Sequence, residues 1–230
     1  MSNLNEIEKK IGIKFKNQDL LQQAFVHRSY LNENKDFKLD HNERLEFLGD
    51  ACMELIVTDY LYNNYPNPEG ELTNWRAALV RGTMISKIAK ELGYESHLLL
   101  SRGESRSTGK ARELILANTF EAVLGAIYLD QGYEAAGKFI KKYLIPYLPE
   151  IISKELYYDP KSKFQEIAQE KVGITPIYKV EKESGPDHAK VFVMGVYLED
   201  KKIADGTGSS KQAAEQEAAR IALDIWQENL

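Results

Sequence analysis

The stretch His41-Asn42-Glu43-Arg44-Leu45-Glu46-Phe47-Leu48-Gly49-Asp50-Ala51 places three acidic residues within an apolar run. Glu43, Glu46 and Asp50 are spaced i, i+3 and i+7, so they share one face of a helix. Carboxylates stacked in this way repel one another, and partial burial adds a desolvation cost unless positive charge compensates it. Nearby arginines or a divalent metal ion would supply that charge. A solvated acidic face with a few salt bridges is the alternative.

Gly49 favours the metal-site interpretation, because glycine inside a helix costs about 1 kcal/mol relative to alanine and suggests close approach of another element. A partner helix is predicted further along the chain, where Asn118 and Glu121 are spaced i, i+3 in a second apolar run. Two such helices can gather their polar side chains around one centre. Oxygen ligands of this kind suit Mg²⁺ or Mn²⁺, whereas four scattered histidines and one cysteine argue against zinc. The residues alone therefore predict a metal-dependent phosphodiesterase or phosphatase.

The composition is that of an ordinary globular protein, with 230 residues, 43% hydrophobic and 28% charged. The single cysteine, Cys52, cannot form a disulfide within the chain and is interpreted as a small core residue. The first ten residues are polar and no apolar run is long enough to span a bilayer, so we expect a cytoplasmic protein with no membrane contact. The net charge of −5 does not favour a nucleic-acid partner, but carboxylates that bind a metal are neutralised by it.

The periodicity of apolar residues changes along the chain, which predicts two domains. Up to about residue 156 the intervals are helical, including a run from Leu79 to Leu92 that Gly93 would end. After Asp159 the pattern predicts the order α-β-β-β-α. We therefore expect an all-α domain over residues 1–152, a linker over 153–158 and a small α+β domain over 159–230. The elements expected in the second domain are a helix over 162–171, strands over 177–182, 191–198 and 202–206, and a helix over 211–226 with Ser209 as its N-cap.

The nine residues from Asn42 to Asp50 resemble the signature of ribonuclease III. Other features of that family stand in the same order around them, namely His27–Tyr30, Glu69–Gly70, Arg81–Gly82 and Ala117–Ala122. The resemblance implies a homodimeric, Mg²⁺-dependent endonuclease for double-stranded RNA, in which Mn²⁺ can substitute and no organic cofactor takes part. It also implies products with 5′-phosphate and 3′-hydroxyl ends and short 3′ overhangs, made from ribosomal RNA precursors and some messenger RNAs.

By the same resemblance, Asp50 and Glu121 would be the catalytic residues, and Glu46 and Asn118 would complete the shell of the metal they hold. The family usually has aspartate at the position of Asn118. An asparagine carbonyl can still ligate Mg²⁺, so we expect activity to persist with a raised Mg²⁺ requirement. The alternative is a protein that binds duplex RNA without cutting it. A phosphohydrolase for small molecules is a second alternative, which the RNA-binding domain disfavours.

Three further positions match the family's catalytic domain. Glu43 and Glu69 correspond to supporting acids near the cleavage site or the dimer interface. Phe47 corresponds to an aromatic residue that inserts into the partner subunit at that interface. For Phe47, ordinary packing in the core is the alternative, and the two roles are compatible.

The second domain resembles a double-stranded-RNA-binding domain, and the run Gly206–Gln216 carries most of the match. Ser210 and Lys211 would place a helix N-terminus and a positive charge at a phosphate. The family commonly has lysine where this chain has Gln212, so this contact is expected to be weaker. Between Asp159 and Leu230, ten Lys and Arg stand against thirteen Asp and Glu, so binding should be modest and sensitive to salt.

The remaining RNA contacts are predicted on the first helix and on a loop of this domain. Gln165, Glu166 and Gln169 present groups suited to 2′-hydroxyls and base edges in the shallow minor groove of duplex RNA. His188 would reach the next minor groove. Taken singly, each is as well explained as an ordinary polar surface residue, and it is their position within the motif that favours an RNA contact.

Overall fold

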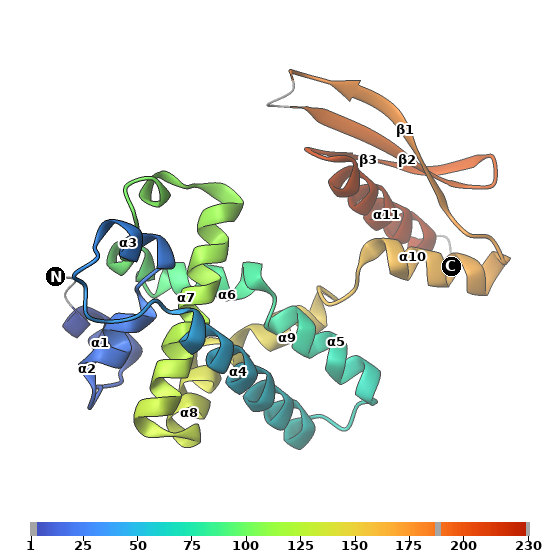
Figure 1. The fold of residues 1–230 in the computed structure, drawn as a ribbon. Helices are drawn as coiled ribbons and strands as arrows, with labels where there is room; N and C mark the ends of the chain where they lie inside the picture. Colours follow the sequence, from blue (N-terminus) through green and yellow to red (C-terminus); the bar gives the residue numbers. More distant parts are fainter. Residues whose placement is uncertain (1–3, 187–189, 229–230) are drawn as a thin grey trace. The chain divides into compact units, whose positions relative to one another are not determined.

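A computed structural model describes residues 4–186 and 190–228. The chain divides into two compact units, Met1–Tyr157 and Tyr158–Leu230, which we call the helical unit and the sheet unit (Figure 1). The boundary falls inside the stretch predicted as a linker. Tyr157 still packs on the helical unit, where its ring centroid lies 6.2 Å from that of Trp75.

The helical unit contains α-helices and three short 3₁₀ segments, in agreement with the predicted all-α class. The α-helices are α1 (Leu4–Ile11), α2 (Gln18–Ala24), α3 (Arg28–Glu33), α4 (Glu43–Asn64), α5 (Glu69–Leu79), α6 (Gly82–Glu91), α7 (Gly109–Gln131), α8 (Tyr133–Tyr143) and α9 (Leu148–Ser153). The 3₁₀ segments are η1 (Tyr94–His97), η2 (Glu104–Arg106) and η3 (Ile145–Tyr147). Across the described ranges, none of the helices combines the length and the apolar character needed to cross a membrane.

The helix α7 lies at the centre of this unit. Its side chains are buried on most of its circumference, from Ile115 to Ile127, and Phe120 packs against Phe139 of α8 with ring centroids 5.4 Å apart. A helix that is apolar nearly all round is expected in the interior. The long helix α4 packs along it, with Met53 and Val57 fully buried.

The run predicted as one helix from Leu79 to Leu92 is in fact two helices. Leu79, the first residue of the run, is the last residue of α5, and α6 begins at Gly82. The helix is interrupted between them because Arg81 takes an extended conformation (φ −59°, ψ 134°). The apolar side chains at both ends are buried, so their helical spacing arises from two helices that face one core. The predicted stop at Gly93 is confirmed, since that residue is left-handed with φ +75°.

The sheet unit has the predicted order α-β-β-β-α. Its elements are α10 (Pro160–Val172), β1 (Ile177–Ser184), β2 (Val191–Leu198), β3 (Lys201–Gly208) and α11 (Lys211–Glu228). The strands form one antiparallel sheet in the order β1-β2-β3, and both helices lie on the same side of it (Figure 1). Phe164, Ala168, Val196 and Ala218 are fully buried in the core between sheet and helices.

Glycines on β3 allow α11 to lie close to the sheet. A Cβ added at Gly206 would lie 2.1 Å from the backbone nitrogen of Ala218. The prediction that Ser209 caps this helix is wrong. The hydroxyl of Ser210 accepts a hydrogen bond from the backbone N–H of Ala213 at 3.1 Å, because the helix begins at Lys211 and its N-cap is therefore the preceding residue.

Candidate functional site

The two helices that carry the predicted acids cross backbone to backbone. A Cβ added at Gly49 of α4 would lie 1.8 Å from the carbonyl oxygen of Glu121, and one added at Gly125 of α7 would lie 2.2 Å from that of Leu45. No side chain fits at either position. The close approach predicted from Gly49 is therefore present, and it sets the two polar faces beside each other.

The crossing brings the predicted metal-site residues together. The side-chain amide of Asn118 on α7 lies near the carboxylate of Glu46 on α4 and acts to lower its pKa. The carboxylate of Glu121 is close enough to Asp50 and Glu46 to be repelled by both. Three of these side chains are half-buried and Asp50 is exposed, so the cluster opens to solvent on one side.

Burial and mutual repulsion raise the pKa of two carboxyl groups in this cluster. Desolvation, followed by the charges of Asp50 and Glu46, raises the pKa of Glu121 to about 8. Desolvation and the charges of Glu43 and Asp50 also raise the pKa of Glu46, against the opposing effect of the Asn118 amide. A divalent cation would relieve both effects, because it stabilises the ionised carboxylates.

The donor set suits a hard, oxygen-seeking cation. Three carboxylates and one amide oxygen match the preference of Mg²⁺ and Mn²⁺. No group of three or more His, Cys, Asp or Glu side chains in the described ranges forms a ready-made metal site. Magnesium keeps several water ligands and takes only one or two carboxylates directly, so an open cluster of this kind fits it.

Glu43 belongs to the outer edge of the acidic face. Its carboxylate lies 3.4 Å from the guanidinium of Arg28 and 3.8 Å from His41 Nδ1. Within the described part of the chain, no arginine or lysine forms an ion pair with Glu46, Asp50 or Glu121. The sequence left open whether arginines compensate the charge of the acids, and in the structure an arginine does so only for the outermost acid, Glu43.

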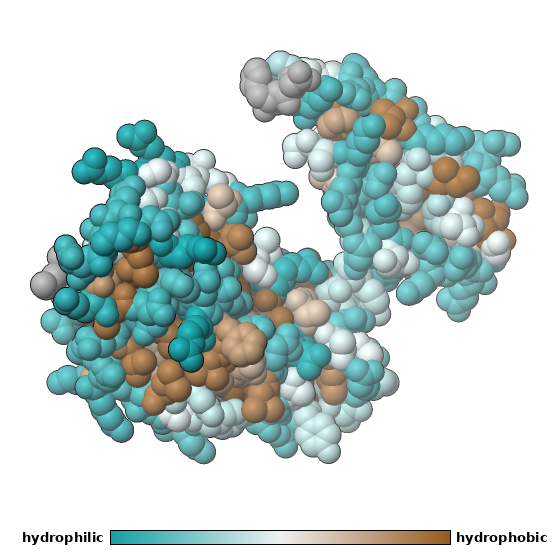
Figure 2. Space-filling model, viewed as in Figure 1, coloured by the Kyte–Doolittle hydropathy of each residue, from teal (hydrophilic) through white to brown (hydrophobic). Residues whose placement is uncertain are grey.

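Phe47 is 80% exposed, so the alternative of core packing is wrong within one copy of the chain. It belongs to a stripe of exposed residues along one side of α4, which is formed by Phe47, Ala51, Leu55, Thr58 and Tyr62. Figure 2 shows apolar side chains gathered on this part of the helical unit. We call these five residues the α4 stripe.

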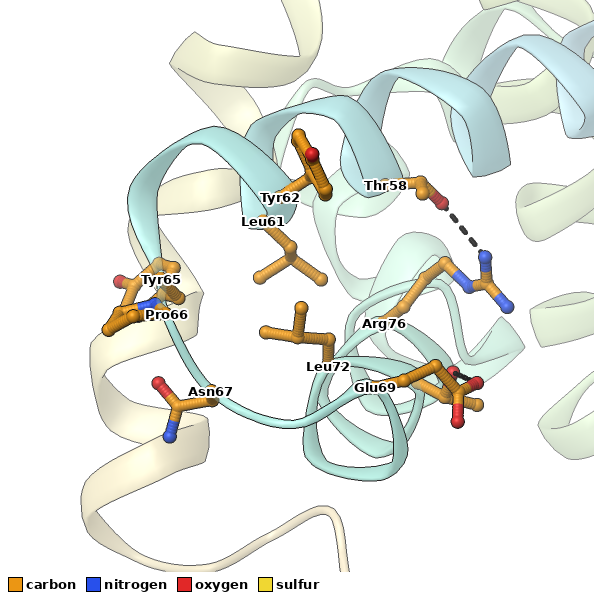
Figure 3. Close-up of a pocket in the computed structure, with 10 residues that line it drawn as sticks. Thr58, Leu61, Tyr62, Tyr65, Pro66, Asn67, Glu69, Leu72 and Arg76 are labelled. Atoms are coloured by element: carbon orange, nitrogen blue, oxygen red, sulfur yellow. Dashed lines mark hydrogen bonds between the residues drawn. The ribbon is translucent and has the colours of Figure 1, made fainter.

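A pocket of about 550 Å³ lies at the far end of the α4 stripe. Figure 3 shows Leu61 of α4 and Leu72 of α5 pointing toward each other inside it. At its rim, Arg76 Nη1 donates a hydrogen bond to Thr58 Oγ1 at 2.8 Å. Tyr62, which is 79% exposed, also lines it. The pocket is predominantly apolar with a polar edge.

Glu69 lines this pocket and does not join the acid cluster of its own chain. Its carboxylate accepts a hydrogen bond from Thr73 Oγ1 at 2.9 Å. It follows the end of α4, and Asp50 lies fourteen residues before that end, which is about 21 Å of helix. Within one copy, these two acids are therefore far apart.

Some of the side chains predicted to contact RNA in the sheet unit are exposed, and others already form hydrogen bonds within the chain. Gln165 and Glu166 are exposed on α10, and Gln169 is exposed with its amide donating to Thr175 Oγ1 at 3.1 Å. Lys211 is exposed at the start of α11, whereas Ser210 is engaged as the N-cap. His188 lies outside the described residues.

Comparison with known proteins matches both units to families. Residues 17–148 match the family described as Ribonuclease-III-like, and residues 160–225 match the double-stranded RNA binding motif. Ribonuclease 3 of Enterococcus faecalis is 46% identical over 220 residues, covering 95% of each chain. Ribonuclease 3 of Borreliella afzelii is 44% identical over 226 residues, covering 98% of this chain and 92% of the relative.

A solved structure resembles the helical unit. The nuclease domain of ribonuclease III from Campylobacter jejuni, described for structural flexibility in a region involved in dimer formation, superimposes with a TM-score of 0.58 at 36% identity. The match covers 64% of this chain and 99% of that one. The family, the fold and the order of the two domains along the chain agree, and the chain therefore belongs to the ribonuclease III family as an endoribonuclease for double-stranded RNA.

Proposed function

We propose that the chain hydrolyses double-stranded RNA with a divalent metal ion held by Glu46, Asp50, Asn118 and Glu121. The observation that carries this proposal is the convergence of three acids from two helices at a crossing where burial and repulsion raise the pKa of Glu121 to about 8. Such an arrangement is unfavourable without a cation. When bound, Mg²⁺ or Mn²⁺ supplies a water of lowered pKa and neutralises the phosphate that is attacked.

The residues around the ion have separate tasks in this proposal. Asp50, which is exposed, and Glu121 stand at the opening of the cluster toward the RNA strand. Asn118 lies beside the carboxylate of Glu46 and would help to orient that ligand. The crossing of α4 and α7 keeps the four side chains at constant separation, because its two glycine contacts allow little movement.

The α4 stripe supports a homodimer with two-fold symmetry. In such a dimer one surface meets itself, so that residue i contacts j and j contacts i. Phe47 at the start of α4 and the pocket at its end are separated by about 21 Å of helix, since Leu61 follows Phe47 by fourteen residues. Two antiparallel α4 helices would therefore place each Phe47 at the pocket of the other copy. They would also carry each Glu69 toward the partner's acid cluster.

The sheet unit would hold the duplex while the helical units cut it. Its exposed Gln165, Glu166 and Gln169 face solvent on α10, and Lys211 stands at the start of α11, which suits minor-groove and phosphate contacts. Two clusters in a dimer would each cut one strand. The expected products carry 5′-phosphate and 3′-hydroxyl ends with short 3′ overhangs, and the expected substrates are ribosomal RNA precursors and some messenger RNAs.

A cleavage assay on a perfect RNA duplex tests this function. We expect cutting with Mg²⁺ and none in EDTA, and we expect Asp50→Asn and Glu121→Gln to abolish cutting while they leave duplex binding intact. Glu113→Gln, on an exposed position of α7, is the matched control and should cut normally. Duplex binding without cutting at any Mg²⁺ or Mn²⁺ concentration would favour the cleavage-impaired alternative instead.

A further inference from the structure

A second pocket in the helical unit has no part in the proposed cleavage reaction. It has a volume of about 630 Å³ and lies between the segment that follows α1 and the helix α8. The half-buried side chains of Ile13 and Ala135 contribute apolar surface to it. Pockets of this size and partly apolar lining are typical of sites for small molecules.

Lysines outnumber acidic side chains around this pocket, where Asp130 attracts Lys16 through its charge. Four lysines line it, namely Lys14, Lys16, Lys138 and Lys142. All four are exposed, and over residues 4–186 and 190–228 none forms an ion pair with a carboxylate. Glu134 is the single acid among the described residues that line the pocket. We call these four residues the lysine cluster.

Charges within α8 offset only part of the repulsion in this cluster. Lys138 and Lys142 stand at i, i+4, where like charges destabilise a helix, whereas Glu134 stands four residues before Lys138 and stabilises it. The negative end of the helix dipole offsets the charge of Lys142, which lies in the last turn. It offers nothing to Lys138 in mid-helix or to Lys14 and Lys16 on the loop.

The loop of the lysine cluster is held firmly in place. The carboxylate of Asp130 accepts hydrogen bonds from the backbone N–H groups of Lys16 and Asn17, each at 2.9 Å. The amide of Gln131 donates to the carbonyl oxygen of Lys14 at 2.9 Å. These bonds tie the loop to the end of α7, directly before α8, so the positive charges converge on a preformed cavity.

The pocket lies apart from the acid cluster. Gln131, which lines it, follows Glu121 by ten residues on α7, which is about 15 Å along the helix. None of the acid-cluster residues lines the pocket.

We propose that this pocket binds a small polyphosphate anion of the nucleoside di- or triphosphate class. Lysine ammonium groups are compact charges suited to phosphate oxygens. Several phosphates in a row would match positive charges spread around the rim, and the apolar surface of Ile13 and Ala135 offers a place for the base. The proposal does not depend on the function proposed for the acid cluster.

Isothermal titration calorimetry on the full chain in EDTA tests this proposal, with inorganic tripolyphosphate and ATP as the probes. EDTA removes the divalent ions through which phosphate would reach the acid cluster. We expect saturable binding of both probes, tighter for ATP. Lys14→Gln/Lys138→Gln should weaken binding about tenfold or more, which corresponds to about 1.4 kcal/mol. Lys171→Gln/Lys201→Gln, which alters two exposed lysines of the sheet unit, should leave it unchanged.

Several results would overturn the proposal. One is that neither probe binds the wild-type chain saturably, and another is that both double variants weaken binding equally. A third is that ATP binds no more tightly than tripolyphosphate, which would rule out a nucleotide as the ligand. A measurement of the affinity for duplex RNA distinguishes a free nucleotide from an RNA backbone as the source of the bound phosphates. We expect Lys14→Gln/Lys138→Gln to keep that affinity, and a parallel loss would show that the lysine cluster contacts RNA instead. Both double variants should keep the wild-type melting temperature, because the four lysines that they replace are exposed, namely Lys14, Lys138, Lys171 and Lys201.

Discussion

Gly49 and Gly125 meet at the crossing of α4 and α7, where neither position has room for a side chain. A Cβ added at Gly49 would lie 3.0 Å from the nitrogen of Gly125, and one added at Gly125 would lie 3.1 Å from the nitrogen of Gly49. The two residues therefore set the spacing of the helices. Because Glu46 and Glu121 stand within one turn of this contact, the same pair of glycines sets the geometry of the acid cluster.

Alanine at either glycine should destabilise the helical unit. Helix propensity favours alanine by about 1 kcal/mol, but the overlap with a backbone carbonyl forces the helices apart, and overpacking of this kind costs about 3 kcal/mol. We expect the second effect to win for Gly49→Ala and Gly125→Ala. Urea unfolding measures it, in a Trp226→Phe background where Trp75 alone reports on the helical unit.

Gly137→Ala is the control for this prediction. Gly137 lies within α8, and a Cβ there would meet nothing within 4 Å. We expect this variant to be more stable by about 0.5–1 kcal/mol, since only helix propensity changes. If Gly49→Ala were as stable as Gly137→Ala, the close crossing would not exist in solution.

Asn118→Asp should lower the Mg²⁺ concentration needed for cleavage. The substitution adds a negative charge to the cluster, and we expect the half-maximal Mg²⁺ concentration to fall by about tenfold, the size typical of changes next to a metal. Titration of initial cleavage rates with Mg²⁺ measures this. If the wild-type chain cut at no Mg²⁺ or Mn²⁺ concentration while the variant did, Asn118 would have removed activity rather than weakened metal binding.

The raised pKa of Glu121 predicts how stability without metal depends on pH. Its folded-state pKa of about 8 lies above the ordinary value of 4.5, so the folded chain binds this proton more tightly than the unfolded chain. The contribution of Glu121 to stability is therefore complete below about pH 4.5 and is lost as the pH rises through about 8. Urea unfolding in EDTA over this range measures it.

Glu121→Gln isolates that contribution, because glutamine does not titrate. As the pH rises, we expect the unfolding free energy of the wild-type chain to fall relative to that of Glu121→Gln. Bound Mg²⁺ should reduce the shift, since the ion replaces the proton. A difference that stayed constant between about pH 5 and pH 8.5 would mean that Glu121 is ionised normally.

Aspartate at Phe47 should prevent formation of the dimer that we propose. A charge on an aromatic side chain that is buried on association removes a central contact, and we expect at least a hundredfold rise in the dimer dissociation constant, about 2.7 kcal/mol. Tyr62→Asp, at the pocket, should act similarly. Sedimentation equilibrium measures both, with Val172→Asp in the sheet unit as control. A dimer of unchanged affinity in Phe47→Asp would place the interface elsewhere.

Two substitutions at the start of α11 should change RNA affinity in opposite directions. Lys211→Ala removes a charge near a helix N-terminus, so we expect weaker binding of duplex RNA and a salt dependence shallower by about one ion. Gln212→Lys adds a charge and should strengthen binding and steepen that dependence. Filter binding at several salt concentrations measures both. Unchanged slopes in both variants would show that this helix end does not contact phosphate.

The sequence predicted those features that depend on spacing along one element. The acids at i, i+3 and i+7 and the single Gly49 inside a helix were enough to predict an acidic face and a close partner. The change of period after Asp159 predicted the fold of the sheet unit. Each of these signals is local, because one helix or strand determines which side chains share a face.

Features that depend on two elements at once could not be predicted in this way. Gly125 is as important for the crossing as Gly49, but the interior of α7 gives no sign of where α4 lies. The break at Arg81 is hidden because buried residues of α5 and α6 happen to keep helical spacing. The pocket beside Tyr62 forms where α5 packs against α4, and the lysine cluster combines residues that lie far apart in the sequence, so only the fold reveals them.

Anomalous diffraction from crystals soaked in Mn²⁺ tests the central claim most directly. That claim is that acids from α4 and α7 together hold a divalent ion. It predicts one strong peak within about 2.5 Å of carboxylate oxygens of both Asp50 and Glu121, which Glu121→Gln weakens or removes. No peak at saturating Mn²⁺, or a peak bound by one helix alone, would contradict the claim.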